Sequence, residues 1–245
     1  MFPETRWSLL AAATLHGDPA GREALESLCR TYWPAVERFL LSRGWSPQDA
    51  EDLTQEFFAA ILPSRVWQRA DRARGKFRNF LLGVLMRVLS RHQRRGQAAR
   101  RGAGITTLEL DALAAEGVEF SAPDGEVQSA FDQAWAERIL ESAMESLSGA
   151  WPANHPDELL LLQRFLPGSD DPPAYEAAAA ALGCTSSSFK SRLFRFRQRF
   201  RELIEQNVAL TISAPHELNA EIAWLEQVLS HPGFEPRESI RAGLE

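Results

Sequence analysis

The chain has 245 residues, and its hydrophobic content of 44% is enough to bury the core of one large domain or two modest ones. No segment approaches the roughly 18 uninterrupted apolar residues of a membrane span, and the N-terminal MFPETRWSLL lacks the basic and then apolar order of a signal peptide. The formal net charge is −6. These features argue against an inserted or exported protein, and we expect a folded cytoplasmic one.

The net charge hides two basic segments in an acidic chain. Residues 65–101 carry 12 Lys and Arg against one Asp, and residues 186–201 carry 6 with no acidic residue. Between them, residues 102–185 carry 2 basic and 15 acidic residues. Such a separation predicts two contacts with a polyanion; the plain alternative is two solvated helix faces.

Apolar residues recur at three- and four-residue spacing along most of the chain, and the sustained alternation typical of strands is absent. The sequence therefore predicts an all-α fold. The expected helices cover residues 5–15, 20–42, 47–62, 76–95, 128–147, 156–166, 173–182, 186–206 and 214–230. Residues 96–127 hold five glycines and Pro123, and they are expected to form a flexible linker between two helical domains.

The first motif is a strong helix start followed by an acidic face. Ser46 is suited to the N-cap and Pro47 to the first turn of the helix SPQDAEDLTQEFFAAIL. A helical wheel that places Leu53 inside predicts the following outward residues: Gln48, Glu51, Asp52, Gln55 and Phe58. An exposed aromatic residue among acids indicates a docking surface for a basic partner, whereas packing of Phe58 within its own domain is the alternative.

The next motif, residues 74–95, has the sequence RGKFRNFLLGVLMRVLSRHQRR. It combines an apolar stripe with arginines, so one side of this helix can be buried while the other faces a phosphate backbone. Aromatic residues interleaved with arginines also suit stacking on unpaired bases. Phenylalanines at helical spacing are nevertheless more often part of a core.

The third motif, residues 174–205, reads as a helix, a turn and a second helix. Gly183 permits the turn and Thr185 is a suitable N-cap for the second helix. The second helix carries basic side chains on both flanks of an apolar stripe, with Ser187, Ser191 and Phe194 outermost. A helix that enters the DNA major groove needs this arrangement, because its flanks meet phosphates and its tip meets base edges.

With these motifs in this order, the chain resembles bacterial RNA polymerase sigma factors of the sigma-70 family, and among them the extracytoplasmic-function (ECF) group. The resemblance covers roughly residues 22–95 and 131–205. The segment DAEDLTQEFF, residues 49–58, is similar to the core-polymerase-binding helix of the family, and GCTSSSFKSRLFRFRQRF, residues 183–200, is similar to its second-domain recognition helix. This resemblance implies a promoter-recognition subunit that binds core RNA polymerase and promoter DNA and uses no cofactor or metal.

The resemblance also assigns roles to individual residues. The implied polymerase-binding residues are Asp52, Gln55, Glu56 and Phe58. The implied contacts to the minus-10 strand are Phe77, Arg78, Asn79, Phe80, Arg87 and Arg91. The implied contacts to the minus-35 duplex are Ser187, Ser188, Lys190, Ser191, Arg192 and Arg195.

The implied division of the chain has four parts. Residues 1–95 form a region 2-like domain, 96–130 an acidic linker, 131–205 a region 4-like helix-turn-helix domain, and 206–245 a C-terminal extension. The extension contains an apolar stripe made by Leu218, Ile222, Leu225 and Leu229. We expect it either to fold back on a basic segment and regulate activity or to extend a domain core. An anti-sigma protein is a further partner that the resemblance leaves open.

An enzyme is not expected from this sequence. Its five histidines are scattered, it has no HExxH, GxSxG or P-loop motif, and Cys29 and Cys184 form no CxxC pair that would indicate a metal site. The nearest alternative is a helix-turn-helix regulator that binds an operator without polymerase. That alternative accounts for residues 174–205 and leaves residues 49–58 unexplained.

Overall fold

The computed structural model describes residues 19–64, 66, 77–98, 110, 112, 125–152, 155–166, 172–212 and 215–229, and it places side chains for these residues except at 19–28, 93–98 and 215. Within these ranges the regular structure is helical, which confirms the all-α prediction there. The elements are α2 (Pro19–Ser42), α3 (Pro47–Ile61), α4 (Phe77–Ala98), α6 (Glu126–Gly149), α7 (Pro156–Gln163), α8 (Tyr175–Ala181), α9 (Ser186–Ala209), the 3-10 turn η3 (Pro215–Glu217) and α10 (Leu218–Leu229). The helix expected at residues 5–15 and most of the expected linker lie outside the described residues.

The predicted start signals of two helices are confirmed. Ser46 caps α3 by accepting a hydrogen bond from the backbone N–H of Asp49 at 3.1 Å, and Thr185 caps α9 by accepting one from Ser188 at 3.2 Å. Each cap satisfies a backbone donor that the first helical turn leaves without an intrahelical partner. Gly183, with φ of +60°, makes the turn between α8 and α9 in a conformation that costs other residues free energy.

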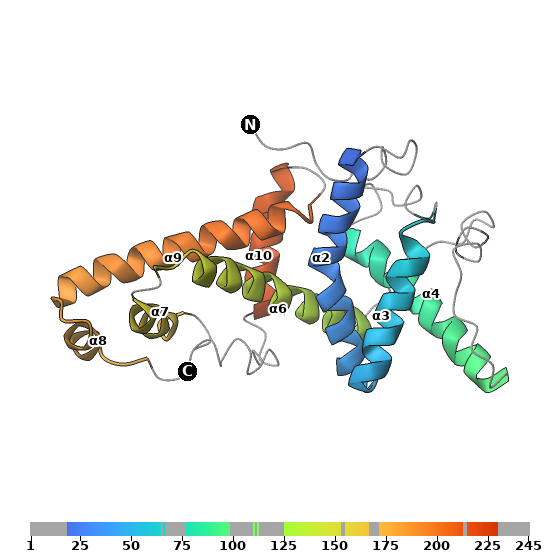
Figure 1. Cartoon of the computed structure of the whole chain (residues 1–245), viewed down its shortest axis with the longest axis horizontal. Coiled ribbons are helices and arrows are strands. Elements are labelled where there is room, and N and C mark those ends of the chain that lie inside the picture. The colour runs from blue at the N-terminus through green and yellow to red at the C-terminus, as the bar shows by residue number, and fades with distance from the viewer. Residues whose placement is uncertain are drawn as a thin grey trace.

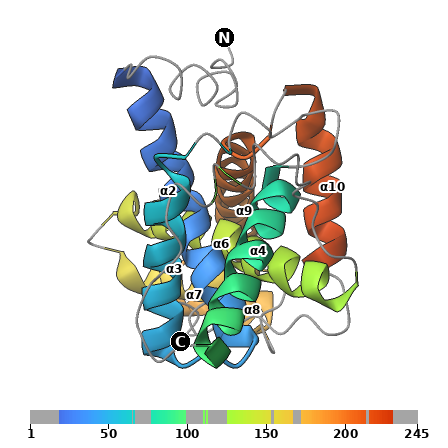
Figure 2. The ribbon, with the colours of Figure 1, turned by 90° about the vertical axis from the view of Figure 1, so that its right-hand side faces the viewer.

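A first hydrophobic core lies among α2, α3, α4, the N-terminal half of α6 and α10 (Figures 1 and 2). Trp135 of α6 is fully buried in it. The rings of Phe39 on α2 and Phe131 on α6 meet edge to face at 5.5 Å between centroids. On its outer side, Arg38 of α2 forms ion pairs with Glu137, at 4.0 Å, and with Glu141. Apolar and charged contacts therefore both join α2 to α6.

A second core lies at the other end of the molecule, among α7, α8, the C-terminal half of α6 and the N-terminal half of α9 (Figure 1). Ala178 and Ala179 of α8 are buried, and their small side chains let α8 pack closely on α9. The rings of Phe165 and Phe189 meet at 5.1 Å between centroids. This core fixes the angle at which α9 leaves the turn after α8.

Helices α6 and α9 run through both cores. Each has 24 residues and so extends about 36 Å. Phe131 to Ile139 of α6 pack in the first core, and so do Val208 near the end of α9 and Ile212 just after this helix. The expected division at residue 130 lies inside α6, and this helix contributes side chains to both cores.

Among the residues that the structure describes, no helix is long and apolar enough to cross a membrane. The same residues contain no group of three or more His, Cys, Asp or Glu side chains that could hold a metal ion.

Candidate nucleic-acid interface

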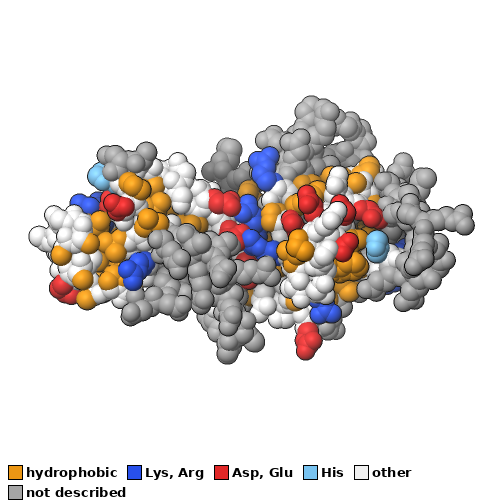
Figure 3. Space-filling model, turned by 60° about the horizontal axis from the view of Figure 1, so that its bottom comes forward, with side chains coloured by type: hydrophobic (Ala, Val, Ile, Leu, Met, Phe, Trp, Pro, Cys, Tyr) orange, Lys and Arg blue, Asp and Glu red, His pale blue; other side chains and the backbone are white. Residues whose placement is uncertain are grey.

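Helix α3 presents an acidic face to solvent. Asp52 and Gln55 are exposed, and Glu56 is half-buried beside them. Asp49 and Glu51 are exposed on the same helix. Seen from the side drawn in Figure 3, acidic side chains gather over the half of the molecule that α2 and α3 form. Such a surface is complementary in charge to a basic partner.

Phe58 is not part of this surface, so its expected outward position is wrong. Its side chain is only 1% exposed. Its ring stacks on Trp33 of α2, with 5.1 Å between centroids and 15° between planes, and meets Phe57 edge to face. The wheel failed because the buried face of α3 is wide enough to include both phenylalanines. Phe58 therefore stabilises the α2–α3 contact.

The first turn of α4 is also more buried than expected. Phe77 is 3% exposed, and its ring meets Tyr32 of α2 edge to face at 5.4 Å between centroids. Phe80 is half-buried and packs against the first core. In this conformation Tyr32 of α2 covers the Phe77 ring, and the contact of Phe77 with the minus-10 strand stays a prediction.

Arg78 is the largest departure from the expected site. Its side chain is 4% exposed, and its Nε donates to Asp132 Oδ1 of α6 at 2.9 Å. Its Nη1 forms an ion pair with Glu221 of α10. The guanidinium also lies 3.6 Å from the ring centroid of Trp224 and 4.8 Å from that of Trp135. In this conformation Arg78 is engaged inside the protein, and its contact with DNA stays a prediction.

This environment changes the acid–base properties of the buried groups. Burial lowers the pKa of the Arg78 guanidinium, while the Asp132 carboxylate opposes that change. Burial also raises the pKa of the Tyr32 phenol. An arginine remains protonated even so, and Arg78 is a permanent cation at the meeting point of three helices.

The other α4 residues of the expected minus-10 set lie nearer the surface. Asn79 is half-buried and its Oδ1 accepts a hydrogen bond from Gln128 of α6 at 3.2 Å. Arg87 is exposed and Arg91 is half-buried. These two arginines are four residues apart and so share one face of the helix. The structure brings them together on a face distinct from the one that holds Arg78.

Helix α9 begins with an exposed polar surface. An open hollow of about 400 Å³ is lined by Ser187, Lys190, Ser191, Phe194 and Arg195. Phe194 is 68% exposed, an unusual position for so large an apolar side chain. The predicted outermost residues of this helix therefore do share one exposed face.

The remaining two residues of the expected minus-35 set have local partners. Ser188 is half-buried and its backbone N–H is held by the Thr185 cap. Arg192 is half-exposed, and its Nη1 donates to Glu158 Oε1 of α7 at 2.9 Å. This ion pair orients Arg192 beside the hollow and offsets part of its charge.

Five residues of the Arg78 environment were absent from the sequence-based site. They are Gln128, Asp132, Trp135, Glu221 and Trp224. The apolar stripe of residues 218–229 was a signal for Glu221 and Trp224, and it left open whether the extension packs on a core or on a basic segment. The structure places this helix on both.

Comparison with known families agrees with the first half of this arrangement. Residues 28–99 match the family model Sigma-70 region 2, a segment that contains α3, α4 and most of α2. The match supports a sigma factor of the sigma-70 family, and such a region implies binding of core RNA polymerase and use of promoter DNA. No curated protein and no solved structure matches the chain.

Proposed function

We propose that the chain is a cytoplasmic sigma factor of the ECF group, which directs core RNA polymerase to promoters by binding and not by catalysis. The observation that carries this proposal is the region 2 match over residues 28–99. The polymerase performs the chemistry, and this chain contributes one protein-docking surface and two DNA-binding surfaces.

The docking surface in this proposal is the acidic face of α3. Asp52, Gln55 and Glu56 lie on it, and Phe58 supports it from inside by fixing α3 against α2. Exposed carboxylates attract a basic partner surface over several ångströms and orient it during encounter. Core RNA polymerase is the partner that region 2 implies.

The minus-10 surface in this proposal is the accessible part of α4. Arg87 and Arg91 are spaced to meet adjacent phosphates, and Asn79 and the half-buried Phe80 can contact unpaired bases at the start of the helix. Cationic side chains beside an aromatic ring are the usual means of holding single-stranded DNA.

The minus-35 surface is the exposed face of α9, in the region 4-like helix-turn-helix that the proposal assigns to α8 and α9. Ser187, Ser191 and Phe194 form the tip of this face, and Lys190 and Arg195 flank it. Hydroxyls can reach base edges, an aromatic ring can contact a thymine methyl, and cations can meet phosphates on either wall of the groove. The α8–α9 contact holds the helix at a fixed angle for this task.

Run-off transcription tests the proposal. Purified core polymerase is supplied with a fragmented genomic template pool, with or without this protein, and transcript start sites are mapped. We expect discrete start sites that require the protein. Gln55→Ala should reduce transcription by weakening polymerase binding, and Arg195→Ala should reduce it by weakening promoter binding.

Two matched variants control for general effects of alanine. Gln206→Ala changes an exposed glutamine on the far half of α9, and Arg43→Ala changes an exposed arginine after α2, outside both basic segments. Both should transcribe like the wild type. Promoter-independent transcription would overturn the proposal, and DNA binding without polymerase recruitment would identify an operator-binding regulator instead.

A further inference from the structure

Helix α10 covers Arg78, a buried arginine in the first turn of α4. Arg78 sits between two carboxylates and two indole rings, and α10 contributes one of each: Glu221 and Trp224. Asp132 and Trp135 of α6 supply the others. A carboxylate and a phosphate bind a guanidinium through the same charge-assisted hydrogen bonds. Glu221 therefore occupies a place on Arg78 that a phosphate could take.

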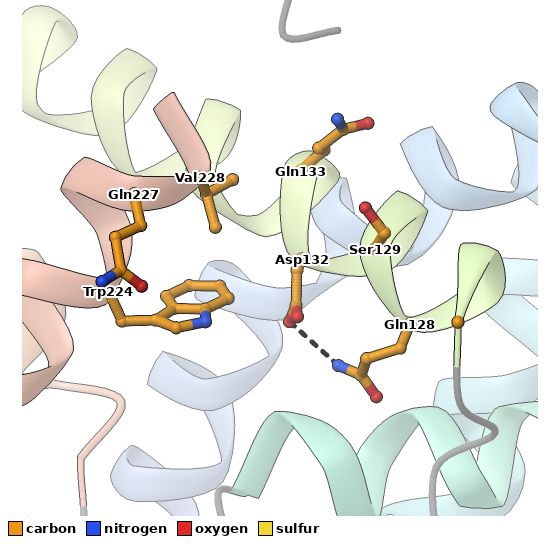
Figure 4. Close-up of a pocket in the computed structure, with 8 residues that line it drawn as sticks. Gln128, Ser129, Asp132, Gln133, Trp224, Gln227 and Val228 are labelled. Atoms are coloured by element: carbon orange, nitrogen blue, oxygen red, sulfur yellow. Dashed lines mark hydrogen bonds between the residues drawn. The ribbon is translucent and has the colours of Figure 1, made fainter. Parts of the chain in front are cut away.

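The seam between α6 and α10 remains open to solvent. A pocket of about 350 Å³ lies along it, and Asp132 and Trp224 are among its lining residues. Figure 4 shows the Trp224 ring directed toward the Asp132 carboxylate, which also accepts a hydrogen bond from Gln128. Because water reaches this seam, the helix can separate from α6 without first opening the centre of the core.

The ion pairs of the cluster allow such a separation. Arg78 pairs with two carboxylates, Asp132 of α6 and Glu221 of α10. If α10 leaves, Arg78 keeps its 2.9 Å bond to Asp132 and neither charge is left without a counter-ion. A buried charge that lost its only counter-ion would strongly destabilise the fold. The second carboxylate is thus the part of the cluster that the first core can release.

Helix α10 contributes two buried hydrophobic residues to the first core, Ile222 and Leu225. Four more are partly buried against that core: Leu218, Trp224, Val228 and Leu229. By comparison, α2, α3 and α4 supply most of the buried side chains of that core. Release of α10 would therefore leave the bundle of α2, α3 and α4 largely intact.

We infer that α10 is an intramolecular cover that competes with the nucleic-acid backbone for Arg78 and holds the first turn of α4 closed until DNA or polymerase displaces it. This inference rests on the proposed function, because it describes how the minus-10 surface of a sigma factor is regulated. In the closed state the accessible minus-10 surface lacks Arg78. In the open state Arg78 joins it.

The test compares Glu221→Gln with Glu226→Gln in the full chain. Both substitutions remove one negative charge from α10, but Glu221 is buried against Arg78 and Glu226 is exposed. The probe is a fluorescein-labelled 20-nucleotide oligothymidylate, and its affinity is measured by anisotropy. Loss of a charge-assisted bond shifts the closed–open equilibrium by about tenfold, and the apparent affinity follows by the same factor when the closed state dominates.

We expect Glu221→Gln to bind the oligonucleotide about tenfold more tightly than the wild type and Glu226→Gln to bind like the wild type. The gain should disappear when Arg78→Gln is added to Glu221→Gln. Hydrogen exchange should accelerate at residues 218–229 in Glu221→Gln while residues 35–61 stay protected. Equal affinities of the two single variants, with equal exchange at residues 218–229, would overturn the inference that α10 covers Arg78.

A second variant keeps the test decisive if Glu221→Gln loosens the whole first core. Trp224→Phe retains both carboxylates and an aromatic ring but weakens the contact with the guanidinium. It should raise the affinity for the oligonucleotide by a smaller factor. An unchanged affinity would be evidence against the inference that α10 covers Arg78. The run-off assay separates the two proposals: absence of protein-dependent start sites rejects the sigma function, whereas wild-type initiation with no effect of Glu221→Gln on DNA affinity rejects the cover alone.

Discussion

Phe58 and Phe194 differ widely in exposure, at 1% and 68%. Phe58 fills space between α2 and α3, where its ring stacks on Trp33. Phe194 has no such layer above it and lines the hollow on α9. A buried aromatic ring contributes to folding, and an exposed one is available to a partner.

This difference predicts opposite phenotypes for two substitutions of the same type. Phe58→Ala should lower the free energy of unfolding by about 3–5 kcal/mol, because it leaves a cavity in the first core. Phe194→Ala should change it by no more than about 0.5 kcal/mol and should instead weaken binding to minus-35 DNA. Urea unfolding and DNA anisotropy measure the two quantities. A stability loss of equal size in both variants would contradict the burial assigned to these rings.

Helix α9 illustrates how one element serves both folding and recognition. Its start is held by the Thr185 cap, and the next residues include Ser187 and Lys190 of the exposed hollow. Further along, Phe189, Leu193 and Phe196 pack in the second core. The cap therefore fixes the end of the helix on which the DNA-facing residues are placed.

Removing this cap is expected to affect both roles. Thr185→Ala should lower the free energy of unfolding by about 1 kcal/mol, because one backbone donor at the helix start loses its partner. Thr185→Ser keeps the hydroxyl and should behave like the wild type. Thermal or urea unfolding gives the first result, and affinity for a minus-35 duplex should fall with it. Equal stability of the alanine and serine variants would show that the cap contributes nothing.

At the scale of the whole molecule, charge is distributed so that a chain of net charge −6 can still bind a polyanion. The later basic residues of α9 are offset by neighbours, since Arg199 pairs with Glu202 at 3.1 Å and Arg201 with Glu205 at 3.0 Å. Lys190 and Arg195 line the exposed hollow nearer the start of the helix. The positive surface is therefore concentrated at the N-terminal half of α9.

Salt dependence of DNA binding tests this distribution. The logarithm of the association constant for a minus-35 duplex should fall linearly with the logarithm of salt concentration, because bound counter-ions are released. Arg195→Ala should make that slope shallower by about 1, whereas Arg43→Ala should leave it unchanged. Titrations at several salt concentrations provide the slopes. A slope for Arg195→Ala equal to that of the wild type would remove Arg195 from the phosphate contacts.

The helices, their caps and the turn before α9 could be predicted from the sequence because they depend on residues a few positions apart. Ser46 needs only Asp49, and Thr185 needs only Ser188. The acidic face of α3 and the exposed face of α9 followed from helical periodicity for the same reason.

Burial was decided by the tertiary structure. Arg78 meets Asp132 and Glu221, which lie 54 and 143 positions away in the chain, and Phe58 is covered by Trp33 of another helix. A helical wheel describes a single helix and cannot show which of its faces other helices cover. Nor can local pattern show that α6 and α9 continue from one core into the other, since that depends on which helices pack along their length. The sequence by itself determined which helices form and which faces are polar, and packing between distant segments decided which of those faces remain accessible.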